Sequence, residues 1–150
     1  MDTIDLKNPT LYINRELSLL EFNRRVIEQA KDENLPLLER LRFLCIASTN
    51  LDEFFEIRVA GLKQQVKYGS TQTGPDNLSP TEVLTRVSET AHQFVEEQYS
   101  VWNDLIIPAM AKDNIRLLRR SQWKSQTSRW IHRYFKDEVL PVLSPIGLDP

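Results

Sequence analysis

Apolar side chains recur every three or four positions along most of the chain, which is the spacing of one face of an α-helix. This spacing predicts a first helix over about residues 18–33. Ser18 and Glu21 stand in the order of a capping box and mark its expected start. A second helix is predicted over about residues 36–67, with Pro36 in its first turn.

A third helix has the clearest start in the sequence. Residues 79–82 (SPTE) combine a capping serine, a first-turn proline and a capping glutamate. Helical spacing continues from there to Lys112, and Pro108 is expected to kink the helix. Residues 69–80 collect two glycines and two prolines among small polar residues, so we expect a flexible connection before this helix.

The last forty residues carry weaker signals. A fourth helix is predicted from near Ser121 to a position before Pro141. Residues 115–118 are short and apolar enough to be extended, and residues 140–150 are typical of an edge strand or an extended arm. The expected fold is therefore all-α: a bundle of three long helices plus a fourth helix, with a short extended C-terminal tail.

Composition agrees with one ordinary globular domain and removes several kinds of chemistry. The 150 residues are 41% hydrophobic and 27% charged, which is not the composition of a disordered chain. Four glycines, two histidines and one cysteine leave no material for a zinc cluster, a disulfide framework or a glycine-rich phosphate loop. His92 and His132 have no further ligand at metal-binding spacing, so we predict no metal site.

The single thiol and the hydropathy pattern indicate a compartment. Cys45 lies in an apolar run and is expected to be buried and unpaired, which fits a reducing environment. The N-terminus does not resemble a signal peptide, and no apolar run is long enough to span a membrane. We therefore expect a cytoplasmic protein.

The formal net charge of -2 hides an uneven distribution. Residues 76–113 hold seven acidic and two basic side chains, whereas residues 114–136 hold seven basic and no acidic ones. This basic stretch could bind a polyanion, or it could pack on the acidic third helix. A small helical nucleic-acid-binding module that uses residues 116–136 is therefore one functional hypothesis. The stretch consists of Arg116, Arg119, Arg120, Lys124, Arg129, Arg133 and Lys136, with Trp123 and Trp130 among them.

The second helix has an unusual second stripe beside its core stripe. One amide, Asn50, stands in it between Phe43 or Ala47 and Phe54. Two aromatic rings and an amide that both donates and accepts could hold a flat base such as adenine. The alternative is that Asn50 makes a buried hydrogen bond inside the bundle or marks a bent turn. The stripe consists of Phe43, Ala47, Asn50, Phe54, Ile57 and Gly61.

Three carboxylates follow Asn50 closely: Asp52, Glu53 and Glu56. Such a cluster could serve acid–base chemistry or a magnesium site. Because Arg58 and Lys63 are near in sequence, we prefer surface ion pairs as the explanation.

Six short strings, taken together, resemble the start of the bacterial polyphosphate kinase family and follow its order over nearly the whole chain. One departure is Leu19, where the family usually has tryptophan. The strings are YINRELS (12–18), LEFNRRV (20–26), PLLERLRFL (36–44), STNLDEFF (48–55), RVAGL (58–62) and YFKDEVLPVLSP (134–145).

The resemblance implies a reversible transfer of the terminal phosphate of ATP to polyphosphate, through a phosphorylated histidine and with magnesium. It implies that the N-terminal helical domain forms one wall of the adenine pocket, and the family's ATP-contacting asparagine falls on Asn50. Phe43 and Phe54 are weaker candidates for packing around the base. The phosphohistidine and the magnesium ligands belong to later domains, and neither His92 nor His132 stands in the corresponding motif. We therefore expect no catalytic residue here and no activity of this chain alone.

The same resemblance divides the chain into an N-terminal helical domain, residues 1–112, and an incomplete beginning of the next, head domain, residues 113–150. The expected partners are ATP, polyphosphate, the remaining kinase domains and a second copy in a homo-oligomer, with neither nucleic acid nor a membrane span. An uncovered second stripe would leave apolar surface exposed and favour self-association.

Overall fold

The computed structural model describes residues 5–147, and these residues form helices and loops without a strand. The all-α prediction is confirmed. The chain divides into two compact units between Ile115 and Arg116. The helical elements of the first unit are η1 (Pro9–Leu11), α1 (Arg15–Lys31), α2 (Leu37–Glu53), η2 (Phe54–Val59), α3 (Ala60–Lys67), α4 (Pro80–Ser100), η3 (Val101–Ile106) and α5 (Ile107–Lys112).

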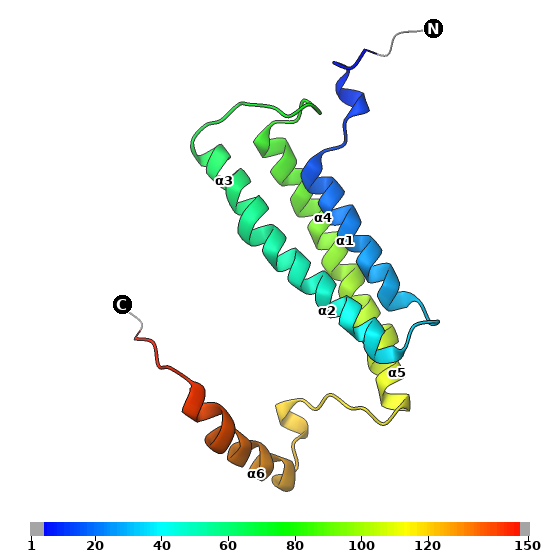
Figure 1. Cartoon of the computed structure of the whole chain (residues 1–150), viewed down its shortest axis with the longest axis vertical. Helices are drawn as coiled ribbons and strands as arrows, with labels where there is room; N and C mark the ends of the chain where they lie inside the picture. Colours follow the sequence, from blue (N-terminus) through cyan, green and yellow to red (C-terminus); the bar gives the residue numbers. More distant parts are fainter. Residues whose placement is uncertain (1–4, 148–150) are drawn as a thin grey trace. The chain divides into compact units, whose positions relative to one another are not determined.

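The first unit is a bundle of three helical rods (Figure 1). One rod is α1, the second is α2 continued through η2 and α3, and the third is α4 continued through η3 and α5. In Figure 1, α1 and α4 run in the same direction and α2 runs opposite to both. Helix α1 packs against α2 and α4, and α3 packs against α4.

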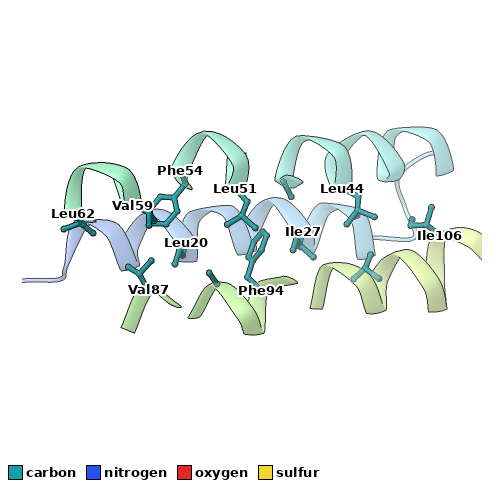
Figure 2. Packing of buried hydrophobic residues seen from close by; sticks show 14 of the residues in the cluster. Leu20, Ile27, Leu44, Leu51, Phe54, Val59, Leu62, Val87, Phe94 and Ile106 are labelled. Atoms are coloured by element: carbon teal, nitrogen blue, oxygen red, sulfur yellow. The ribbon is translucent and has the colours of Figure 1, made fainter. Parts of the chain in front are cut away.

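Apolar side chains from all three rods fill the space between them (Figure 2). Ile27 of α1, Phe94 of α4 and Ile106 of η3 are fully buried there. Leu44 and Leu51 join them from α2 at the predicted helical spacing. Removal of this apolar surface from water is the main stabilising contribution to the bundle.

The first helix begins earlier than expected, and its capping residue is different. Asn14 is the N-cap: its side chain accepts hydrogen bonds from the backbone N–H groups of Glu16 (3.0 Å) and Leu17 (3.2 Å). The predicted capping box at Ser18 is wrong, because Ser18 lies inside the helix and its N–H bonds to the Asn14 carbonyl. Asn14 Nδ2 also donates to Asp76 in the long connection, 2.7 Å away, which ties that connection to the start of α1.

The predicted capping box of the third helix is confirmed. Glu82 Oε2 accepts from the Ser79 N–H at 2.8 Å, and the Glu82 N–H donates to Ser79 Oγ at 3.3 Å. Around the predicted kink at Pro108, the chain forms the π-helical segment η3 and then α5. Proline lacks an N–H and crowds the carbonyl four residues earlier, so a regular α-helical turn does not fit there.

The second helix covers the predicted range but is not uniform. Residues 54–59 are π-helical, between two α-helical parts. The second rod ends after α3 in a Schellman motif. Gly69 has a positive φ of 68°, and the Ser70 N–H donates a hydrogen bond to the Gln65 carbonyl. A wider π turn inside an α-helix is rare and is found often at functional sites.

The second unit contains η4 (Arg120–Gln122), α6 (Ser125–Tyr134), η5 (Phe135–Val139) and η6 (Leu140–Val142). The fourth helix therefore begins at Ser125 rather than near Ser121, and a 3-10 turn continues through Pro141. Residues 140–147 contain a 3-10 turn and then irregular backbone without a strand, so the edge-strand alternative is wrong for these residues. The extended-arm alternative still fits residues 143–147, where Leu143 has extended backbone angles. Residues 115–118 form neither a helix nor a strand, which is compatible with an extended segment. The remaining tail residues, 148–150, lie outside the described part of the chain.

Cys45 is exposed on α2 and is not buried as its apolar surroundings in the sequence suggested. Across residues 5–147, no helix is both long enough and apolar enough to cross a membrane.

Candidate functional site

A groove of about 310 Å³ lies between α1 and the second rod. Its walls are mostly apolar, with two amides, one carboxylate and one guanidinium among them. Such a site suits a flat, partly apolar ligand with a polar edge. The lining residues are Leu19, Leu20, Phe22 and Asn23 from α1, Asn50 and Glu53 from α2, and Phe54, Ile57 and Arg58 from η2.

Asn50 is half-buried in the wall of this groove. Its Nδ2 donates a hydrogen bond to Asn23 Oδ1 of α1 over 3.1 Å, so the buried hydrogen bond considered from the sequence does form. Its Oδ1 accepts no hydrogen bond from residues 5–147 and is not among the buried unpartnered atoms. The two interpretations of Asn50 are therefore compatible, because one end of the amide bonds within the bundle and the other end stays free for a ligand.

Asn23 was not singled out from the sequence. Its side chain is only 4% exposed, and its Nδ2 donates to the Ala47 backbone carbonyl of α2 at 2.8 Å. The available signal was its position: Asn23 stands in the buried stripe of α1 with Leu20 and Ile27, at helical spacing. A polar side chain in such a stripe requires partners, since an unpaired buried amide is costly.

The two candidate aromatic residues have different surroundings. Phe54 lines the groove, is 7% exposed and meets Phe55 edge to face at 5.9 Å between ring centroids. Phe43 packs against the buried core and does not line the groove, so the structure does not bring both rings to Asn50.

The second stripe is not left uncovered as a whole. Ala47 and Phe54 are core residues of the bundle, whereas Ile57 is 59% exposed at the edge of the groove. The stripe therefore loses its cover only in part: Ala47 and Phe54 are buried, and Ile57 provides exposed apolar surface as expected.

The carboxylate cluster after Asn50 also differs from its expected role. Among the described residues, Glu53 and Glu56 form no ion pair with Arg58 or Lys63. Glu53 and Arg58 instead line the groove, where they contribute a carboxylate and a guanidinium. A guanidinium can bind phosphate through two parallel hydrogen bonds, so Arg58 is a further residue that the sequence did not indicate for this site.

Neither histidine is among the residues that line the groove. His92 is exposed on α4, where its Nδ1 lies 2.7 Å from the Ser88 carbonyl, and His132 is exposed on α6. No group of three or more histidine, cysteine or carboxylate side chains that could hold a metal ion occurs in the part of the chain that the structure describes.

The family of the chain follows from its match to a family model. The model of the polyphosphate kinase N-terminal domain matches residues 12–118. The chain belongs to the polyphosphate kinase family. The residues that line the groove all fall inside the matched range, and most of the basic stretch lies beyond it.

Polyphosphate kinases from several bacteria are similar to almost all of this chain. The one from Pseudomonas putida is 55% identical over 145 residues, which is 97% of this chain and 20% of that protein. The one from Neisseria gonorrhoeae is 49% identical over 136 residues, 91% of this chain and 20% of that protein. The chain thus spans about a fifth of the length of these polyphosphate kinases.

A solved structure agrees with the fold. The crystal structure of the polyphosphate kinase from Porphyromonas gingivalis superimposes with a TM-score of 0.68 at 29% identity, covering 87% of this chain and 18% of that one. The helical bundle is therefore the fold of a polyphosphate kinase N-terminal domain.

Proposed function

We propose that this chain is the N-terminal part of an enzyme that reversibly transfers the terminal phosphate of ATP to polyphosphate, and that it forms one wall of the adenine pocket. The observation that carries the proposal is the groove that contains Asn50, with a free amide oxygen, inside the family-matched domain.

The groove offers what an adenine ring requires. Its apolar walls, including Phe54 and Leu20, would cover the faces of the ring, and the Asn50 amide would meet its polar edge. Phe43 packs against the bundle core and does not line the groove.

The role of this chain in phosphoryl transfer is positioning. Such reactions depend on holding the nucleotide in line with the acceptor and on cations around the phosphates. As the family resemblance implies, we assign magnesium and the phosphorylated histidine to other parts of the enzyme. The isolated chain is expected to be inactive.

We take residues 1–112 as the N-terminal domain and residues 113–150 as the beginning of the head domain, which the division of the chain between Ile115 and Arg116 supports. We also propose a cytoplasmic location, because an exposed Cys45 thiol stays reduced there.

The exposed cations of residues 116–136 fit a polyanion such as polyphosphate. They would equally fit a nucleic acid, which was the alternative function. Polyphosphate is preferred because the chain belongs to the polyphosphate kinase family.

The test uses a full-length polyphosphate kinase that carries this chain as its N-terminal part, referred to below as the full-length enzyme. Asn50→Ala removes the amide and is expected to raise the KM for ATP about 3- to 10-fold, the equivalent of one hydrogen bond. The turnover number kcat should change little. Asn103→Ala, which removes an exposed amide on η3, is the matched control and should leave both constants unchanged. An unchanged KM in the Asn50 variant would remove Asn50 from the site.

A further inference from the structure

A chain of two hydrogen bonds joins the backbone of α2 to the groove through α1. Asn23 Nδ2 donates to the Ala47 carbonyl at 2.8 Å, and Asn23 Oδ1 accepts from Asn50 Nδ2 at 3.1 Å. The path therefore leaves α2 at Ala47, passes through one buried side chain of α1, and returns to α2 at Asn50.

The direction of these two hydrogen bonds is set by the Ala47 carbonyl. A backbone carbonyl accepts hydrogen bonds and never donates them, so the amino end of Asn23 must face Ala47. The oxygen of Asn23 then faces Asn50, and because that oxygen only accepts, Asn50 must turn its amino end toward it. The Asn50 oxygen is thereby left as the free end of its amide, with no donor among the described residues.

We infer that Asn23 is a positioning residue that fixes the Asn50 amide so that its oxygen accepts from the 6-amino group of adenine. This inference rests on the proposed function of the groove. Guanine carries a carbonyl at the same ring position and presents no donor to this oxygen. The pair would therefore distinguish adenine nucleotides from guanine nucleotides without contact between Asn23 and the base.

The burial of Asn23 explains why this residue can hold the orientation. At 4% exposure it has little access to water, and its two bonds keep both ends of the amide satisfied. Without Asn23, the Asn50 amide could rotate and present its amino end to the groove, so that an acceptor on the base would bind as well as a donor. Sites built to hydrogen-bond a substrate group discriminate against analogues that lack it, because a buried polar group is then left unpaired.

The experiment compares two substrates in the full-length enzyme: ATP, and purine riboside triphosphate, which lacks the 6-amino group. The measured quantity is the ratio of kcat/KM for the two. We expect a ratio of about 10 for the unsubstituted enzyme. Asn23→Leu keeps the volume but removes the acceptor that faces Asn50, and it should lower the ratio to less than about 3. In the Asn23→Leu variant, the lower ratio should result from a higher KM for ATP, with kcat unchanged.

A conservative variant separates orientation from packing. In its protonated form, which burial favours, Asn23→Asp keeps both a donor for the Ala47 carbonyl and an oxygen toward Asn50, so it should retain the discrimination. In an Asn50→Ala background, Asn23→Leu should have no additional effect on the ratio, because Asn23 acts through Asn50. If the leucine variant does not fold, Asn23→Ser replaces it, since serine is too short to reach Asn50.

The outcomes distinguish this inference from the proposed function. If Asn50→Ala abolishes the discrimination while Asn23→Leu leaves it intact, Asn23 has only a structural role and the adenine wall stands. Independent, additive effects of the two substitutions would also overturn the inference. If Asn50→Ala changes neither the ratio nor the KM for ATP, the adenine wall itself is refuted.

Discussion

Arg40 near the start of α2 donates a hydrogen bond from Nε to the backbone carbonyl of Ala30 near the end of α1, over 2.9 Å. The Ala30 carbonyl belongs to the last turn of its helix, where no further N–H is available within the helix. Arg40 is only 8% exposed, so this bond forms away from water. It closes the turn between the two helices that form the groove.

Arg40→Met should therefore destabilise the chain by about 1.5–3 kcal/mol, because the Ala30 carbonyl loses a charged donor. Urea denaturation followed by circular dichroism measures the change. Arg42→Met is the matched control, since Arg42 is exposed and only pairs with Glu39 at 3.6 Å; it should shift the unfolding free energy by less than about 0.5 kcal/mol. Equal effects of the two substitutions would mean that the hydrogen bond to Ala30 does not stabilise the fold measurably.

The centre of the bundle should respond more strongly. Phe94 is fully buried among residues of the three rods, and Phe94→Ala is expected to cost about 3–5 kcal/mol through lost burial and the cavity left behind. Tyr68→Ala removes an aromatic side chain that is 80% exposed and should change stability by less than about 0.5 kcal/mol. The midpoints of urea unfolding provide the comparison, and a small effect at Phe94 would contradict the core described above.

The capping box at the start of α4 predicts a dependence on pH. The exposed Glu82 carboxyl accepts hydrogen bonds from the Ser79 hydroxyl and from the Ser79 backbone N–H. Both bonds, the hydroxyl one more strongly, lower the pKa of this carboxyl from its usual value of 4.5. A lowered folded-state pKa means that the carboxylate stabilises the fold fully above pH 4.5 and that this contribution is lost as the pH falls through the folded pKa.

Glu82→Gln should accordingly be less stable than the unsubstituted chain at pH 7, and the difference should shrink as the solution is acidified below pH 4.5. Urea unfolding midpoints at a series of pH values measure it. Gln93→Ala, which removes an exposed side chain without a titratable group from the same helix, should show no such trend. A difference between Glu82→Gln and the unsubstituted chain that stays constant with pH would show that the Glu82 charge is not what the cap uses.

Exposed apolar side chains around the groove predict self-association of the isolated chain. Phe22 and Ile57 line the groove and are both more than half exposed. Light scattering should show a mass that rises with concentration, and Phe22→Ser combined with Ile57→Ser should lower it. A monomer mass at all concentrations in the unsubstituted chain would contradict this expectation.

Sequence patterns predicted a helix start well where the capping residues all stand close together in the sequence. The start of α4 was predicted correctly because serine, proline and glutamate form their cap within four residues. At α1, the capping pattern at Ser18 predicted the wrong start, because the structure caps this helix with Asn14, which also bonds to the distant Asp76. The π turn from Phe54 to Val59 was not predicted, because helical spacing alone does not reveal one locally widened turn.

The site was predicted only in part for a similar reason. Asn50 was found from its own helix and from the family resemblance, and the structure adds its partner Asn23. That partner, together with the exclusion of Phe43 from the groove, depends on how α1 docks against the second rod. Periodicity identifies the faces of each helix but not the register in which two faces meet.

The most direct test of the central claim is a crystal structure of the full-length enzyme with a non-hydrolysable ATP analogue. The adenine ring should lie in the groove between α1 and the second rod, with its 6-amino nitrogen at hydrogen-bonding distance, about 2.7–3.2 Å, from Asn50 Oδ1. Asn50 Nδ2 should still bond to Asn23. A base bound away from this groove, with Asn50 free of the nucleotide, would contradict the adenine wall proposed for this chain.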